Sequence, residues 1–248
     1  MKITAKKISA PYLSAIIKKM LLMDSSIYIN IDKDRVYSNV YTPTKDVVKS
    51  FSLPINDVFE FDKPLDKTIK LSFFSGSKLL NCISYFDPHK LQADISYFED
   101  KDEGVYYAEK ITLKDQKLKI DVFCQDISLG FTSMTEDQTK QAFSIANEEF
   151  QFAISREDLT KVVSLLSMDK GELVKIYGDS EGIHFKTDAF DIIVDDTKKI
   201  STDVKSTFKV FFDRIDKETY NVSVCENKIV LFSQETETNS AMNLAITE

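Results

Sequence analysis

An internal repeat constrains this chain more than any other feature of its sequence. The dipeptide Ile8-Ser9 recurs 146 positions later as Ile154-Ser155, and apolar residues follow both copies at the spacing i, i+3 and i+4. This spacing is typical of a helix that packs one face against a core. We therefore expect two helices with the same place in two similar domains. The aligned apolar pairs are Leu13 with Leu159, Ile16 with Val162, and Ile17 with Val163.

The repeat continues beyond the two helices into segments with strand character. Ile27 aligns with Leu173 at the same spacing, and each lies before an acidic turn and a second strand. Thr68–Leu71 resembles Thr207–Val210, and each is a strand that leads toward a short helix-like stretch. A chance match between two amphipathic helices is the alternative, but the common order of elements in both halves argues against it. The sequence therefore predicts a tandem duplication.

Strand signals dominate the rest of the chain. Stretches rich in Val, Ile, Phe and Tyr alternate with polar residues, and only six Gly and five Pro interrupt 248 residues. The turn segments Asp32–Arg35, Asp179–Gly182 and Glu226-Asn227 separate successive strands and predict hairpins. The predicted strands are 26–31, 69–74, 91–98, 105–113, 118–123, 173–177, 182–187, 190–194, 208–212, 220–225, 228–233 and 241–246.

Helices are few, and their starts carry capping signals. Ser9 precedes the first helix as a possible N-cap, with Pro11 in its first turn. Ser155 precedes the second helix, and Asp158 completes a capping-box-like pattern. Helical spacing also occurs at 75–86 and in the short stretch 211–217. We predict an α+β fold with helices on one face of antiparallel sheets.

A polar segment separates the two copies. Residues 126–149 are rich in Thr, Gln, Glu, Ser and Asp and lack alternating apolar residues, as is typical of an interdomain linker. We therefore expect a first domain over 1–125, a linker over 126–149 and a second domain over 150–248.

Sequence motifs of catalysis and metal binding are missing. No Gly-rich phosphate loop, Gly-x-Ser-x-Gly elbow or His-Glu-x-x-His motif occurs, so we expect no enzyme, no cofactor and no metal. His184 lies inside an alternating strand and is interpreted as a strand-face residue. The acidic runs Glu99–Glu103 and Asp195-Asp196 fall at predicted strand ends or turns, where solvated charge is the ordinary explanation.

The cysteines and the start of the chain bear on location. Cys82, Cys124 and Cys225 are isolated and predict buried thiols, not a disulfide, metal or redox pair. The sequence has no signal-peptide pattern and no apolar run of membrane-spanning length. We expect a soluble protein of the cytoplasm or nucleus that is neither secreted nor bound to a membrane.

The charge arrangement on the helices is more informative than any motif. The net charge of −8 has the wrong sign for a protein that holds DNA by affinity, because Lys and Arg supply that affinity. Yet no acidic residue occurs from Lys2 to Met23, and Lys18 and Lys19 lie opposite the apolar face of their helix. The stretch 75–86 likewise carries Lys78 and no carboxylate.

The second copy is mixed in charge. Lys161, Arg214 and Lys217 point outward in the corresponding segments, together with four carboxylates. For any one of these residues, a solvated surface role is as good an interpretation as a DNA-facing role. The four carboxylates are Glu157, Asp158, Asp213 and Asp216.

The repeated helix–strands–helix–strands pattern resembles the DNA sliding clamps over nearly the whole chain. It is similar to the two-domain type typified by proliferating-cell nuclear antigen and the clamps of large tailed phages. Ile154–Leu159 leads the second copy, and Glu226–Leu231 is followed by a last strand over 241–246. The strongly marked motifs of the cellular nuclear-antigen branch are missing, which favours a viral or phage clamp.

The resemblance implies a ring. Three two-domain subunits would close head to tail, with sheets outside and helices lining a hole that encloses duplex DNA. The lining residues it implies are Lys18, Lys19, Lys78, Lys161, Arg214 and Lys217, which would contact phosphates without reading sequence. The implied partners are a DNA polymerase, which the clamp tethers for processivity, and a clamp loader ATPase, which opens the homotrimer.

Family resemblance also implies a pocket for a short partner peptide near the linker. Phe143 and Ile145 are the nearest apolar residues, and pinning the linker to the second domain is the alternative role for both. Two other functions stay open. One is a structural or assembly β-protein of a virion or scaffold, and the other is a clamp-fold processivity subunit that binds DNA without closing a ring.

Overall fold

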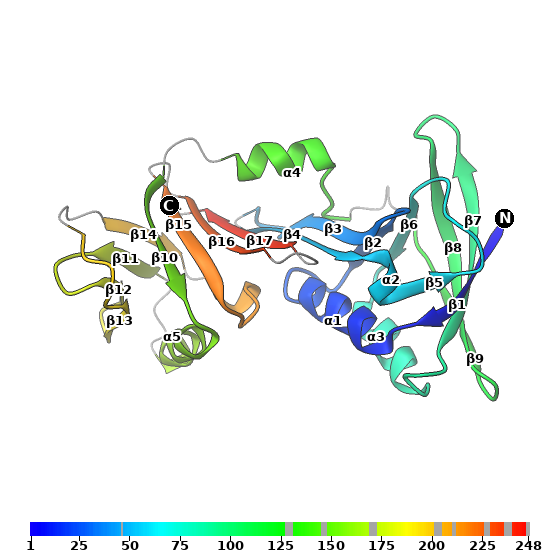
Figure 1. Cartoon of the computed structure of the whole chain (residues 1–248), viewed down its shortest axis with the longest axis horizontal. Coiled ribbons are helices and arrows are strands. Elements are labelled where there is room, and N and C mark those ends of the chain that lie inside the picture. The colour runs from blue at the N-terminus through cyan, green and yellow to red at the C-terminus, as the bar shows by residue number, and fades with distance from the viewer. Residues whose placement is uncertain are drawn as a thin grey trace. The chain divides into compact units, whose positions relative to one another are not determined.

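The computed structural model describes residues 1–45, 47–126, 131–144, 148–168, 173–200, 205–209, 212–225, 229–235 and 240–246. The chain forms two compact units. The first consists mainly of residues 1–43 and 50–133, and the second mainly of residues 44–49 and the chain from Met134 onward. Each unit combines antiparallel strands with a small number of helices (Figure 1).

The first unit is built from nine strands among its described residues: β1 (Lys2–Ile8), β2 (Ile27–Ile31), β3 (Arg35–Tyr41), β4 (Val47–Pro54), β5 (Phe59–Phe61), β6 (Ile69–Phe73), β7 (Gln92–Asp100), β8 (Val105–Lys114) and β9 (Lys119–Phe123). Their order is β4-β3-β2-β6-β8-β7-β1-β5, and β9 pairs with β8. The strands β4, β3, β2 and β6 form one part of this sheet, and β8, β7, β1, β5 and β9 form the other. A short parallel pairing of β6 with β8 joins the two parts.

Two helices of this unit pack against each other. They are α1 (Ala10–Leu21) and α3 (Gly76–Ser84), while α2 (Ile55–Val58) is a single turn. Leu13, Ile16 and Ile17 of α1 are buried, as the helical spacing predicts. Gly76 lets the start of α3 lie close to β2, because a Cβ at this position would be only 2.6 Å from Cγ2 of Ile27.

The second unit repeats the plan. Its strands are β10 (Glu148–Ile154), β11 (Leu173–Gly178), β12 (Ile183–Lys186), β13 (Asp191–Asp195), β14 (Lys205–Lys209), β15 (Tyr220–Cys225), β16 (Ile229–Glu235) and β17 (Ser240–Ile246). One sheet has the order β13-β12-β11-β14, and β10, β15, β16 and β17 are neighbours in the other. The helical segments are α4 (Glu136–Phe143), α5 (Arg156–Met168) and the 3-10 turn η2 (Phe212–Arg214).

Strand pairing confirms the predicted duplication. β1 pairs with β7 as β10 pairs with β15, and β2 lies between β3 and β6 as β11 lies between β12 and β14. The repeated helices bury matching side chains, since Leu13 is 2% exposed and Leu159 is 0% exposed. The two halves therefore share one topology and one apolar pattern.

Several sequence-based predictions need correction. The strand predicted at 208–212 is wrong at its end, because β14 stops at Lys209 and Phe212 begins η2. Phe212 is buried among Phe185 and Phe232, so the core holds it in a turn. The predicted turn at Glu226-Asn227 lies outside the described residues.

Other elements were not predicted. β1 is interrupted by lysines and a register shift between Ala5 and Lys7, and β4 begins with three consecutive buried residues. β5 has only three residues, and β10 alternates clearly but begins inside the segment interpreted as linker. The helix α4 lies within the segment interpreted as linker, and Thr135 and Gln138 cap its start reciprocally. The domain and linker limits given above stay predictions. In the part of the chain that the structure describes, no helix is long and apolar enough to cross a membrane.

Candidate nucleic-acid interface

The outer faces of α1 and α3 form one continuous helix layer in the first unit, where the two helices lie side by side (Figure 1). We call this layer the basic helix pair. Lys18 and Lys78 are exposed on it, and Lys19 is half-buried. Neither helix contains an acidic residue, and Lys18 and Lys19 occupy the last turn of α1. The pair therefore presents positive charge without carboxylates of its own.

Local structure explains how these lysines come to be exposed. The buried stripe of α1 leaves Ala15 and Lys18 on the opposite side. In α3, Ser75 accepts a hydrogen bond from the backbone nitrogen of Lys78 at 3.3 Å and so caps the helix. Ser9 also has the N-cap position of α1, but its side chain makes no capping hydrogen bond, in contrast to the prediction.

Two tyrosines accompany these lysines, and sequence reasoning missed both. Tyr12 on α1 is 46% exposed, and Tyr85, which ends α3, is 72% exposed. Single exposed aromatic residues are normal on a protein surface, so the sequence offered no signal that set these two apart. Their rings add apolar contact area to a surface that is otherwise Lys, Ser, Asn and Ala.

The helix of the second unit is electrostatically different. Lys161 is exposed on α5, but its ammonium lies 3.1 Å from Glu157 and 3.5 Å from Asp158. The hydrogen bond from Lys161 to Glu157 raises the lysine pKa above its ordinary value. Arg214 in η2 is half-buried, and Lys217 after it is exposed. Lys161 therefore carries a charge that its own helix largely neutralises.

Of the two residues predicted to receive a partner peptide, the structure describes only one. Phe143 ends α4 and is half-buried, whereas Ile145 lies outside the described residues. Another apolar contact in the first unit stacks Phe74 on Phe131 at 5.3 Å between ring centroids. Thr132 accepts a hydrogen bond from the backbone nitrogen of Tyr41, and Val40 forms a β-bridge with Ser133. The segment 131–133 is thus held against β3.

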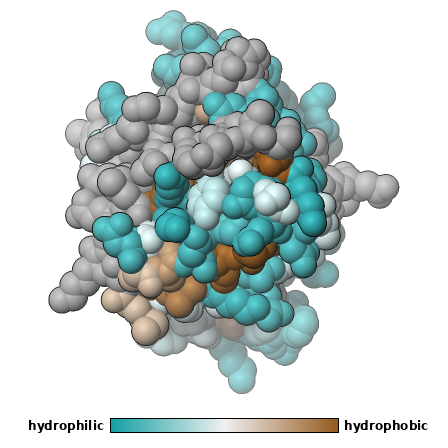
Figure 2. Space-filling model, turned by 90° about the vertical axis from the view of Figure 1, so that its left-hand side faces the viewer, coloured by the Kyte–Doolittle hydropathy of each residue, from teal (hydrophilic) through white to brown (hydrophobic). Residues whose placement is uncertain are grey.

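Five strands, β5, β9, β10, β13 and β14, have a single strand neighbour among the described residues, and two of these edges carry exposed apolar side chains. β9 pairs with β8, and β13 pairs with β12, and neither has a second strand neighbour among the described residues. Phe123 on β9 is 66% exposed and Ile193 on β13 is 42% exposed. Figure 2 views the second unit from its end and shows hydrophobic surface between hydrophilic side chains. An edge strand with exposed apolar residues is prone to pair with another chain.

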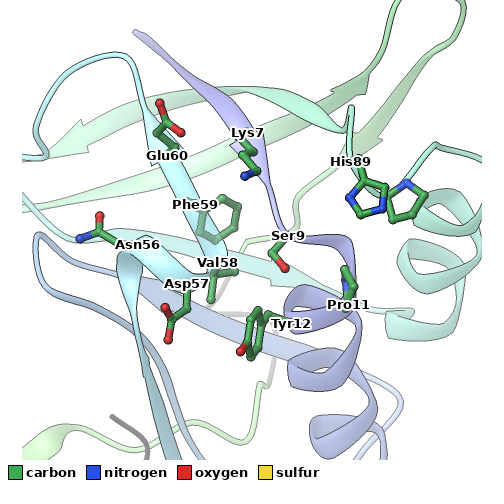
Figure 3. Close-up of a pocket in the computed structure, with 11 residues that line it drawn as sticks. Lys7, Ser9, Pro11, Tyr12, Asn56, Asp57, Val58, Phe59, Glu60 and His89 are labelled. Carbon is green, nitrogen blue, oxygen red and sulfur yellow. The ribbon is translucent and has the colours of Figure 1, made fainter.

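A hollow of about 400 Å³ opens near the start of α1 (Figure 3). It is bordered by β1 with the start of α1, by α2 with β5, and by the segment that follows α3. Lys7 and His89 approach it together with the carboxylates of Asp57 and Glu60. Because both signs of charge line the hollow, charge alone defines no class of ligand.

Polar residues singled out in the sequence have structural partners. His184 lies on β12 as predicted, and its ring nitrogens lie 2.9 Å from Asp191 and 3.2 Å from Asp179. Asp100 accepts hydrogen bonds from the backbone of Asp102 and Glu103, as is typical of a turn. Among the described residues, no group of three or more His, Cys, Asp or Glu side chains is arranged to hold a metal ion.

Comparison with solved structures places the fold. The chain superposes on proliferating cell nuclear antigen from Entamoeba histolytica with a TM-score of 0.73 and 11% identity, over 99% of this chain and 98% of that one. It matches A. fulgidus PCNA, solved with the C-terminal region of FEN-1, with a TM-score of 0.69, 12% identity and coverage of 99% and 98%. The match to the PCNA2–PCNA3 complex of Sulfolobus tokodaii has a TM-score of 0.66 and 11% identity, over 100% of this chain and 99% of that one.

The chain therefore has the fold of the PCNA-type sliding clamps over nearly its whole length. This confirms the predicted α+β architecture of two tandem clamp-type domains. No protein-family model matches the chain, and no curated protein matches it in sequence. The fold is thus shared with these proteins at a sequence identity of 11–12%.

Proposed function

We propose that this protein is a DNA sliding clamp, which encircles duplex DNA and tethers a replicative polymerase without chemistry of its own. The observation that carries the proposal is the basic helix pair on a chain with the clamp fold. In a protein of net charge −8, two neighbouring helices without a carboxylate are a marked local exception. Such a surface suits weak contact with phosphates, which carry no sequence information.

A ring would resolve the conflict between net charge and DNA binding. An open binder needs affinity, and the net charge opposes it. A closed ring remains on DNA by topology, so a few lysines on the inner surface suffice and the acidic remainder limits tight binding. The lining we propose is Lys18, Lys19 and Lys78 from the first unit with Lys161, Arg214 and Lys217 from the second, in a homotrimer.

Two of the edge strands, β9 and β13, support closure. If β9 of one subunit pairs with β13 of the next, the interface is heterologous, and three such contacts can close a ring. Pairing would cover Phe123 and Ile193 and satisfy the unpaired backbone groups of both edges. An edge left open would favour aggregation instead.

Partners follow from this role. A polymerase would dock a short peptide near Phe143 and Ile145, and an ATP-driven clamp loader would open the ring. Docking of a partner segment on this fold has a parallel in the A. fulgidus protein, whose structure contains the C-terminal region of FEN-1.

Two measurements test the proposal. Light scattering across a dilution series should give a mass near three times 28.4 kDa. After incubation with a clamp loader and ATP, the protein should remain on nicked circular DNA and leave linear DNA through its ends. A strict monomer at high concentration, or equal retention on the two DNAs, would contradict the ring. A monomer that still increases processivity would identify the subunit that binds DNA without closing a ring.

A further inference from the structure

A second hollow, of about 570 Å³, lies on the outward side of β7 and β8 in the first unit. We call it the acidic aromatic hollow. Its nine lining residues come from β7, β8, the turn between them and the segment after β9. They are Phe98, Asp100, Glu103, Tyr107, Ala108, Glu109, Cys124, Gln125 and Asp126.

Two aromatic rings form the apolar part of this hollow. Phe98 and Tyr107 are directly opposite each other on β7 and β8, and their rings stack with centroids 5.8 Å apart. Phe98 is 50% exposed. Tyr107 is half-buried, so Phe98 supplies most of the exposed aromatic surface, and apolar surface with a polar rim is a feature of sites that bind a partner. The stacked rings present π-electron density, which attracts a cation as well as apolar groups.

The lining charges have a single sign. Four carboxylates and no Lys, Arg or His line the hollow. The surface already holds one ammonium group at its border, since Lys70 lies 2.6 Å from Glu103 and 5.0 Å from the centre of the Tyr107 ring. The hydrogen bond from Lys70 lowers the pKa of Glu103 and keeps that carboxylate ionised. The remaining lining carboxylates are Asp100, Glu109 and Asp126.

We propose that the acidic aromatic hollow docks a segment of a partner protein that carries Arg or Lys beside apolar residues. A cationic side chain would lie over the ring of Phe98 with Glu109 as its counter-ion, as Lys70 does with Tyr107 and Glu103. Nucleic acid is disfavoured, because four carboxylates repel phosphate. The inference goes beyond the clamp role and does not depend on it.

The test uses the whole chain and two fluorescein-labelled peptides. One contains two arginines between leucines, and in the other citrulline replaces arginine with nearly the same shape and no charge. Fluorescence anisotropy at low salt should show the arginine peptide binding at least about fivefold more tightly than the citrulline peptide. Phe98→Ala should weaken arginine-peptide binding by about fivefold, and Glu109→Gln by about threefold.

Matched controls separate this site from general effects. Tyr85→Ala removes an even more exposed aromatic ring elsewhere, and Glu60→Gln removes an exposed carboxylate outside the hollow. Both controls should keep the affinity of the unmodified protein. Equal binding of the two peptides, no binding, or full binding by Phe98→Ala would overturn the proposal. It would also be overturned if Phe98→Ala lowered self-association and left peptide binding intact, because the occupant would then be a second copy of the chain.

Discussion

The two units share a sheet topology and differ in their helices. β2 lies between β3 and β6 as β11 lies between β12 and β14, and β1 pairs with β7 as β10 pairs with β15. The first unit carries the basic helix pair, whereas α5 of the second carries Lys161 in ion pairs with Glu157 and Asp158. The second helix of the repeat has nine residues in the first unit and a three-residue turn, η2, in the second.

This difference separates what the fold requires from what function can vary. Buried positions such as Leu13 and Leu159 keep their apolar character in both units, because burial of apolar area stabilises each sheet–helix contact. The outward helix positions make no such contribution and are free to differ. Charge on that face is therefore informative about function, and uncompensated positive charge is concentrated on the helices of the first unit.

The largest expected effect tests whether the two helices are equivalent in packing. Leu13→Ala and Leu159→Ala each remove a side chain that is at most 2% exposed. Each should lower the free energy of unfolding by about 2–5 kcal/mol, because a cavity replaces a packed side chain. Urea denaturation monitored by circular dichroism measures both. A cost below about 1 kcal/mol for either variant would break the structural equivalence.

The strand β7 of the first unit carries a buried acid, Asp94, whereas the corresponding strand of the second unit does not. Burial would raise the pKa of Asp94, but hydrogen bonds from Lys114, Lys2 and Thr4 outweigh it and hold this pKa at about 2. On the corresponding strand β15, the buried polar residue is the uncharged Ser223. Asp94→Asn should therefore cost about 2 kcal/mol at neutral pH, and Ser223→Ala less than about 1 kcal/mol.

The pH dependence of that cost follows from the lowered pKa. The stabilisation by Asp94 is complete above the ordinary pKa of about 3.9 and is lost as pH falls through about 2. Unfolding free energies measured from pH 7 down to about pH 2 should converge for the unmodified protein and Asp94→Asn. A constant difference over that range would show that lost packing, not charge, causes the effect.

Charge removal from the helices tests the functional half of the comparison. Lys18→Gln with Lys78→Gln should weaken duplex DNA binding about tenfold at low salt and reduce the slope of log affinity against log salt by about 2. Lys161→Gln with Lys217→Gln should reduce that slope by less than about 1, because Lys161 is already paired. If both double variants lost the same DNA affinity and the same salt slope, the lysines of the two units would contribute equally to DNA binding, against the expectation.

Much of the fold could be predicted because periodicity reports burial directly. The spacing of Leu79 and Ile83 predicted α3, and the turn at Asp32–Arg35 predicted the hairpin that β2 and β3 form. β1 could not be predicted in this way, because lysines interrupt its alternation, and a register shift between Ala5 and Lys7 moves the pattern. The sequence marked 211–217 as a short helical stretch, but it gave no signal that Phe212 belongs to the turn η2 and not to the preceding strand, since tertiary packing of Phe212 decides this.

The candidate site was predictable only in part. The absence of carboxylates from α1 and α3 is visible in the sequence, and so is the i, i+4 spacing of Glu157 and Lys161 that predicts their ion pair. The acidic aromatic hollow was not predictable, because it joins residues from β7, β8 and the segment after β9. Only strand register places Phe98 opposite Tyr107.

The smallest expected effect concerns the starts of the repeated helices. Ser155 accepts a hydrogen bond from the backbone nitrogen of Asp158 at 3.0 Å, whereas Ser9 makes no capping bond to α1. Ser155→Ala should therefore cost about 1 kcal/mol of unfolding free energy and Ser9→Ala only a few tenths. Thermal unfolding of both variants under one buffer condition measures the difference. Equal costs would mean that Ser9 caps α1 in solution, and the two helix starts would then be as alike as their sequences.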